Sequence, residues 1–201
     1  MENITTDFYS LIGNYNKEPL NMYGTIGEMF MLARGKPLIV TSGGKKLFEE
    51  RPELFLEVLC DVPRDEKSLL SCGRNGDVYK VGLNGKVLAE KRYGKWRENG
   101  IDQIKEMAEA SHLLKNCNGI RMAKTYCATP DKLLMEAVEL PTVEKLVNND
   151  KNMHAVLRKA LVNKGWREIS KHMSVSNDST FVDEKNGEYE FILVDPEMIR
   201  Q

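Results

Sequence analysis

The sequence predicts an α+β fold whose central part is a five-stranded antiparallel sheet with one helix. From residue 67 onward, short runs of alternating apolar and polar residues are separated by glycine-containing turns, the pattern of an antiparallel meander. Asn84-Gly85 lies between the second and third runs and favours a two-residue hairpin, because both residues tolerate a positive φ. A helical apolar stripe and two further strand-like runs complete the central part.

The elements of this central part, expected at residues 67–140, follow one another as three strands, one helix and two strands. The strands are predicted at residues 68–71, 77–81, 86–91, 120–128 and 133–138. The helix is predicted at residues 101–115, because Ile101, Ile104, Met107 and Leu114 recur on one helical face.

Residues 1–66 are expected to form a small mixed N-terminal extension of unknown role. The pattern favours a helix around Gly24–Arg34, an apolar run at residues 37–41 and an amphipathic helix near residues 45–59. Ser42-Gly-Gly-Lys-Lys46 lacks the G-x-x-x-x-G-K-[ST] spacing of a phosphate-binding loop, so we interpret it as an ordinary turn.

The C-terminal part, residues 141–201, is predicted to be small. Residues 152–165 form an amphipathic helical pattern that ends at Gly165. A hairpin follows, with strands at residues 180–183 and 189–195 and a turn at Lys185-Asn-Gly187.

Composition excludes little but indicates an ordinary cytoplasmic protein. The 29 basic and 30 acidic residues nearly balance, so neither a nucleic acid nor an anionic lipid surface is indicated as a partner. The four cysteines are widely spaced without a C-x-x-C pair, as expected of reduced thiols. No apolar run is long enough to predict a membrane span.

Two motifs lie in register on the first three strands. Ser71-Cys-Gly-Arg-Asn-Gly-Asp-Val78 reads S-x-G-x-x-G-x-V, in which Gly73 and Gly76 would let backbone N–H groups approach phosphates while Val78 covers a purine. Ala89-Glu-Lys91 follows on the third strand as an A-x-K. Together they resemble the glycine-rich loop and phosphate-binding lysine of protein kinases, with the first glycine replaced by serine.

This resemblance extends to the helix and the last strand. The segment beginning Ala108-Glu-Ala-Ser-His112 is similar to the family's helix with its inward carboxylate, which makes Glu109 the expected partner of Lys91 and Glu106 the alternative. Residues 133–139 resemble the hinge strand. Met135 would screen the back pocket, and backbone groups of Glu136 and Val138 would bind the adenine edge.

The resemblance therefore implies a nucleotide-binding kinase-like N-lobe followed by a truncated C-lobe, with ATP and Mg²⁺ as cofactors. Asp195 ends an apolar strand, as the magnesium-binding Asp of D-F-G does, although the triplet here is Asp195-Pro-Glu197. Only four residues follow this triplet in the sequence. The expected relatives are the small archaeal and RIO-like kinases and the compact kinase of the KEOPS complex.

The catalytic loop H-R-D-x-x-x-x-N can be aligned in three ways. One places His172 on the family's histidine, with Ser174 and Ser179 where the catalytic Asp and the metal-binding Asn belong. A second places His172 at the base position and Asn177 at the metal-binding position. A third uses Glu168 as the acid.

Two functions follow from these alignments. The chain is expected to be either a minimal atypical Ser/Thr protein kinase, with Lys91 and His172 or Glu168 in catalysis, or a pseudokinase that keeps the kinase shape. In the second case it would regulate or dock to a protein partner. A third hypothesis, an unrelated α+β domain with accidental matches, stays open at this stage.

Overall fold

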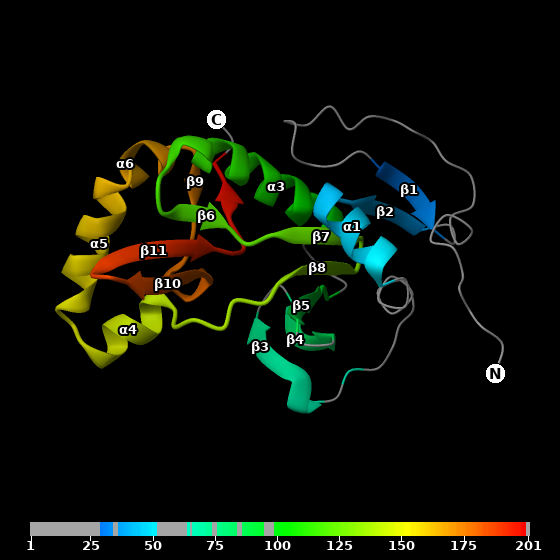
Figure 1. The fold of residues 1–201 in the computed structure, drawn as a ribbon, viewed down its shortest axis with the longest axis horizontal. Helices are drawn as coiled ribbons and strands as arrows, with labels where there is room; N and C mark the ends of the chain where they lie inside the picture. The colour runs from blue at the N-terminus through cyan, green and yellow to red at the C-terminus, as the bar shows by residue number, and fades with distance from the viewer. Residues whose placement is uncertain are drawn as a thin grey trace. The chain divides into compact units, whose positions relative to one another are not determined.

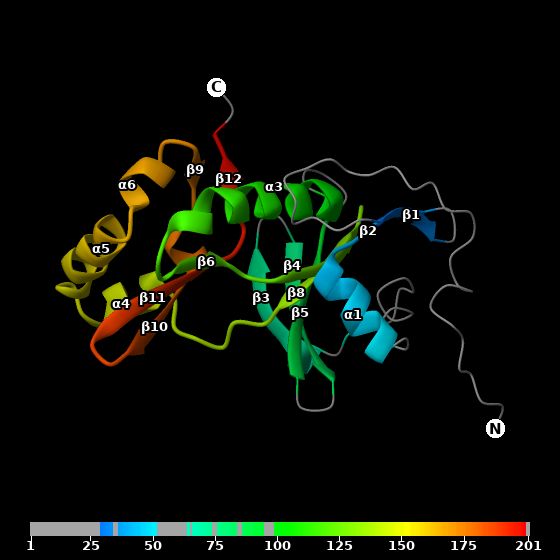
Figure 2. The ribbon, with the colours of Figure 1, turned by 45° about the horizontal axis from the view of Figure 1, so that its top comes forward.

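The fold is that of a computed structural model, drawn in Figures 1 and 2. It describes residues 29–33, 36–51, 64, 66–73, 76–83, 86–94 and 99–199. Within these residues the chain forms two compact units. Unit 1 contains the residues up to Lys105 and Lys124–Ala137, and unit 2 contains Glu106–Ala123 and the residues from Val138 onward. Each unit is described by itself.

Unit 1 is built on a seven-stranded sheet of order β1-β2-β7-β8-β5-β4-β3, in which every neighbouring pair is antiparallel. Its strands are β1 (Met29–Ala33), β2 (Lys36–Val40), β3 (Leu69–Gly73), β4 (Gly76–Leu83), β5 (Lys86–Arg92), β7 (Thr125–Thr129) and β8 (Lys132–Glu136). The predicted α+β class and antiparallel pairing are confirmed. The sheet is larger than predicted, because β1 and β2 extend it beyond β7.

The predicted helix around Gly24–Arg34 is wrong where the structure describes it, since Met29–Ala33 form strand β1. Met, Leu and Ala favour helices on their own, but pairing with β2 overrides this weak preference. Most of the apolar run at residues 37–41 lies in strand β2, which ends at Val40. The remaining residues of that predicted helix, 24–28 and Arg34, lie outside the described residues.

Helix α1 (Ser42–Glu50) begins at the segment interpreted as a turn. The Thr41 hydroxyl accepts a hydrogen bond from the Gly44 N–H at 3.0 Å and donates to the Thr125 carbonyl at 2.7 Å. A Cβ on Gly44 would lie 1.9 Å from the Tyr126 carbonyl oxygen. Gly44 therefore allows the capped start of α1 to pack against β7. The helix predicted near residues 45–59 is confirmed as far as Glu50.

The β4–β5 hairpin forms as predicted. Leu83 pairs with Lys86, which leaves two connecting residues, although Asn84-Gly85 itself lies outside the described residues. A 3-10 turn, η2 (Glu66–Ser68), precedes β3.

Helix α3 (Gly100–Leu113), continued by η3 (Leu114–Asn116), confirms the predicted central helix. Its buried positions include Ile101, Ile104, Met107 and Leu114, as the apolar stripe predicts. The Asn99 side chain accepts a hydrogen bond from the Asp102 N–H at 2.9 Å at the start of the helix. Its residues up to Lys105 belong to unit 1 and the rest to unit 2.

Unit 2 contains a three-stranded sheet of order β10-β11-β6 and a two-stranded sheet of β12 and β9. Its strands are β6 (Ile120–Met122), β9 (Met173–Ser174), β10 (Thr180–Lys185), β11 (Glu188–Leu193) and β12 (Glu197–Met198). Its helices are α4 (Val143–Asn149), α5 (Met153–Asn163), α6 (Trp166–Ile169) and the 3-10 turn η4 (Asn177–Ser179). The core includes Leu157, Met173 and Phe191, each 1% exposed or less.

Two predictions about unit 2 are confirmed and one is wrong. The C-terminal hairpin turns at Asn186 (φ 54°) and Gly187 (φ 79°), and α5 is followed by Gly165 at φ 92°. The single strand predicted at residues 120–128 is in fact two strands. β6 pairs in parallel with β11 and β7 joins the sheet of unit 1, because the chain leaves one ladder for the other at Ala123-Lys124.

In the part of the chain that the structure describes, no helix is both long and apolar enough to cross a membrane.

Candidate functional site

Strand register brings four of the predicted nucleotide-binding residues to one face of the sheet of unit 1. Val78 of β4 pairs with Lys91 of β5, and Ala89 of β5 pairs with Met135 of β8. Directly opposed residues in an antiparallel ladder point to the same side, as do residues two apart on one strand. We call the surface formed by Val78, Ala89, Lys91 and Met135 the Lys91 face.

Lys91 is unusual in being a lysine that is only 5% exposed. Its Nζ lies 5.0 Å from the centre of the Tyr93 ring, a distance at which a cation is attracted to the ring face. Removing an ammonium group from water is unfavourable unless other groups compensate. The Tyr93 ring is one of the groups that hold the Lys91 ammonium in this buried position.

The opposite face of β5 carries a buried carboxylate that sequence reasoning missed. Glu90 is fully buried and accepts hydrogen bonds from Arg64 at 2.7 Å and from Arg92 at 2.5 Å. Burial alone would raise the pKa of Glu90, but the two guanidinium groups outweigh it and hold the pKa below its ordinary value. Arg64, Glu90 and Arg92, here called the Glu90 cluster, form a structural ion-pair network.

The two glycines of the S-x-G-x-x-G-x-V motif pair with each other at the end of the β3–β4 hairpin. Gly76 has a φ of +141°, and a Cβ there would lie 2.0 Å from the Arg92 carbonyl oxygen. The contact between β4 and the end of β5 thus requires glycine at this position whether or not a phosphate binds. Arg74 and Asn75 lie outside the described residues.

The predicted hinge begins where β8 ends. The Glu136 N–H donates to the Lys124 carbonyl at 2.7 Å, and its side chain accepts from the Lys124 N–H at 3.0 Å. The Glu136 N–H is therefore engaged within unit 1. The segment after it leaves the sheet, and the backbone of Val138 makes no hydrogen bond within the described part of the chain.

On α3 the two candidate carboxylates differ in burial. Glu109, expected to point inward, is exposed, whereas Glu106 is half-buried. Glu109 lies opposite the stripe of buried residues on this helix, while Glu106 lies beside it, between Gln103 and Ala110. The alternative residue therefore fits the inward position better than the first choice.

In unit 2, Asp195 lies two residues after the end of β11 and has a φ of 57°. Non-glycine residues seldom adopt this left-handed conformation, and such residues cluster at functional sites. The preceding residue is fixed, because the Val194 N–H donates to the Ser179 carbonyl at 2.9 Å. The strand-ending position predicted for Asp195 is confirmed, and its role in binding a metal stays a prediction.

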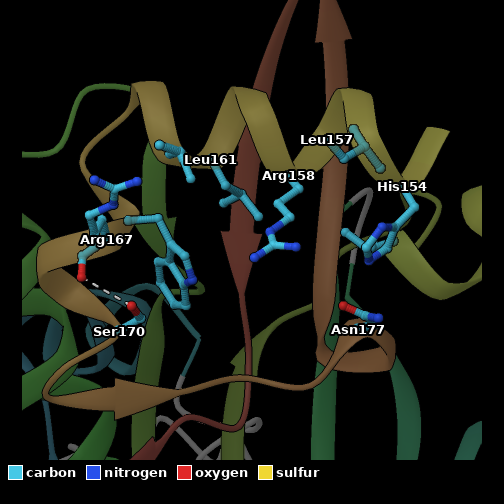
Figure 3. A pocket seen from close by; sticks show the side chains of 10 residues that line it. His154, Leu157, Arg158, Leu161, Arg167, Ser170 and Asn177 are labelled. Atoms are coloured by element: carbon cyan, nitrogen blue, oxygen red, sulfur yellow. Dashed lines mark hydrogen bonds between the residues drawn. The ribbon is translucent and has the colours of Figure 1, made fainter. Parts of the chain in front are cut away.

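The residues of the three catalytic-loop alignments are spread from α6 to η4, and all are exposed except the half-buried Ser179. Glu168 accepts a hydrogen bond from Lys171 at 2.5 Å, which lowers the pKa of Glu168 and makes it a weak base. His172 lies in the turn before β9, and Ser174 lies within β9 opposite Glu197. Asn177 begins η4 and faces a pocket under α5 (Figure 3).

Within the described residues, no group of three or more His, Cys, Asp and Glu side chains could hold a metal ion by itself. Mg²⁺ at a nucleotide site is usually bound by one or two carboxylates, the phosphates and water. A single carboxylate such as that of Asp195 would fit this donor set.

Neither the models of known protein families nor the curated proteins contain a match to this chain.

Proposed function

We propose that this chain is an ATP-binding protein of the protein-kinase-like class, and that unit 1 binds the nucleotide on the Lys91 face. The observation that carries the proposal is the common side of the sheet shared by Val78, Ala89, Lys91 and Met135. These four residues were chosen from sequence motifs spread over nearly sixty positions. Ala89 and Lys91, two apart on β5, share a face in any strand, so the support comes from Val78 and Met135 lying on that same side.

The arrangement of elements also supports the class. Five strands of the sheet follow the order β3-β4-β5-β8-β7, and α3 lies in the chain between β5 and β7. This is the sequence of three strands, one helix and two strands that the kinase resemblance implies, with the hairpin carrying Gly73 and Gly76 at the edge of the sheet.

Each residue of the Lys91 face has a defined role in the proposal. Val78 and Ala89 offer apolar surface to the purine, and Met135 limits the depth of the site. The Lys91 ammonium neutralises the α- and β-phosphates as a point charge. The Glu136 carbonyl takes the adenine edge. The roles expected of Val138 and Asp195, which belong to unit 2, stay predictions.

Phosphoryl transfer is the less supported half of the proposal. Glu168 is held ionised by Lys171, and the first alignment replaces both essential side chains by Ser174 and Ser179. We therefore propose nucleotide binding as the principal activity, with a regulatory or docking role towards a protein partner, and slow transfer through His172 as the second candidate.

The test is nucleotide-dependent thermal stabilisation. ATP with Mg²⁺ at about one hundred times its Kd should stabilise the folded chain by about 2.7 kcal/mol, which corresponds to a rise in Tm of roughly 5–10 °C for a chain of this size. Lys91→Met keeps the length and apolar part of the side chain and should abolish the rise. Lys46→Met, at an exposed position of α1, is the matched control and should leave it unchanged.

Three outcomes would contradict the proposal. The wild type could fail to respond to ATP, Lys91→Met could respond as fully as the wild type, or the response could be lost in Lys46→Met. The last result would place the nucleotide at the start of α1. Transfer of radiolabelled γ-phosphate, measured in the wild type and in His172→Ala and Glu168→Gln, then separates the kinase from the pseudokinase.

A further inference from the structure

Unit 2 contains a pocket whose lining includes Asn177 but none of the other residues chosen from the kinase-like motifs. It has a volume of about 370 Å³ and lies between α5, α6 and η4 (Figure 3). Its apolar wall is formed by Val143, Leu157, Leu161, Val162 and Trp166. This volume is within the range of pockets that hold small organic molecules.

The polar part of the pocket is cationic. Arg158 projects from α5 into the space between α5 and η4 (Figure 3), and Arg167 lies on the α6 side. Among the described residues that line the pocket, none carries a carboxylate. The balance of charge in this pocket is therefore positive, unlike that of the whole chain, whose formal net charge is −1.

Arg158 is not neutralised by its surroundings. Its guanidinium group forms no hydrogen bond or ion pair with any other residue that the structure describes. Of the carboxylates adjacent in sequence to lining residues, Glu168 pairs with Lys171 and Asp178 accepts from Ser176. The third, Glu144, is exposed. A planar guanidinium group is suited to bidentate binding of a carboxylate or phosphate.

The far end of the pocket supplies further hydrogen-bonding groups. His154 of α5 points toward Asn177 of η4 (Figure 3). A ligand held by its anionic group at Arg158 would place its body between Leu157, Leu161 and the indole of Trp166. Aromatic or branched aliphatic groups match such a wall.

From these contacts we propose that the pocket binds a small organic anion, one carboxylate or phosphate group on an aromatic or branched aliphatic body, with Arg158 as the anion-binding residue. The site is separate from the Lys91 face and does not depend on nucleotide binding there. It makes Asn177 a ligand-binding residue of this pocket.

The sequence provides a direct reporter, because it contains only two tryptophans, Trp96 and Trp166. In a Trp96→Phe chain, the fluorescence of Trp166 reports on the pocket wall. Phenyl phosphate and benzoate are the probes. Inorganic phosphate lacks the apolar body and benzyl alcohol lacks the charge, so each should bind at least about tenfold more weakly than phenyl phosphate.

Arg158→Gln and Lys159→Gln form a matched pair, since each removes one positive charge from neighbouring exposed positions of α5 and only Arg158 lines the pocket. Arg158→Gln should weaken the better probe about tenfold or more, while Lys159→Gln should change its Kd by less than about twofold. Because both side chains are exposed, circular dichroism should show unchanged folding in both variants.

The proposal is overturned if neither phenyl phosphate nor benzoate gives a saturable change in Trp166 fluorescence, or if the two charge variants weaken binding equally, which would indicate a general electrostatic effect. A Lys91→Met chain should bind phenyl phosphate as the wild type does. Loss of binding in that variant would show that the probe occupies the proposed nucleotide site, and would also overturn the inference.

Discussion

Replacing Glu90 by Gln should destabilise unit 1 strongly, although the two side chains have nearly the same size. Glu90 is fully buried, and its partners Arg64 and Arg92 are only 11% and 25% exposed. The substitution removes the negative charge that both guanidinium groups face and leaves two poorly hydrated cations beside a neutral amide. Removal of one partner from a buried ion-pair network typically costs about 3–5 kcal/mol, and we expect a loss in this range.

The assay must report on unit 1 alone, and Cys127 provides the means. This thiol is fully buried on β7, and burial raises its pKa well above the ordinary value, so it reacts only when the sheet opens. In a chain whose other three cysteines are replaced by Ala, the urea dependence of Cys127 alkylation gives the free energy of opening. Glu66→Gln, an exposed carboxylate of η2, is the matched control and should change it by less than about 0.5 kcal/mol.

The pH dependence gives an independent test of the same ion pairs. The pKa of Glu90 is lower in the folded chain than in the unfolded chain, so its contribution is complete above the unfolded value of about 4.3 and is lost as the pH falls below it. The wild type should therefore lose stability more steeply than Glu90→Gln on acidification below about pH 5. The buried ion-pair argument would be refuted if Glu90→Gln lost less than about 1 kcal/mol of stability at pH 7 and if the stabilities of the two proteins fell in parallel on acidification.

Two further predictions concern backbone positions. Gly76→Ala should destabilise unit 1 by at least about 2 kcal/mol in urea unfolding, because Gly76 has a φ of +141° and the added Cβ would clash with the Arg92 carbonyl. The control Gly82→Ala, with no atom within 4 Å of the added Cβ, should change the free energy of unfolding by less than about 1 kcal/mol. Equal effects of the two substitutions would show that the close approach to Arg92 is relieved without cost. Asn186→Gly should melt at or above the wild-type Tm, because Asn186 has a φ of 54° and glycine adopts a positive φ without strain; a clearly lower Tm would show that the Asn186 side chain itself stabilises the turn.

The sequence predicts the central strands of unit 1 well because their signals are local. Alternation of apolar residues and the Asn84-Gly85 turn specify the β4–β5 hairpin without reference to the rest of the chain. The strand β1 was missed because its apolar residues have no strand period, and its conformation depends on pairing with β2. The break at Ala123-Lys124 was missed for the same reason, since each half of that segment is stabilised by a different sheet.

The two candidate sites also differ in whether local sequence signals predict them. The Lys91 face follows from motifs with fixed spacing, and strand register brings those residues to one side. The pocket of unit 2 could not be predicted, because Arg158, Trp166 and Asn177 have no distinctive spacing and meet only when α5, α6 and η4 fold together. One signal was present, however, since an arginine at 158 lies one residue from the buried Leu157 on an otherwise regular amphipathic helix.

The strand β5 shows why Lys91 can remain buried beside an acidic neighbour. Successive residues of a strand point to opposite faces, so Glu90 forms ion pairs with Arg64 and Arg92 on one side while Lys91 lies on the other. The carboxylate next to Lys91 in sequence is thus fully used and cannot neutralise the lysine across the sheet. Because Glu90 anchors β5 through two arginines, it fixes the strand from which Lys91 projects. The Glu90 cluster acts on the proposed nucleotide site only through the backbone of β5.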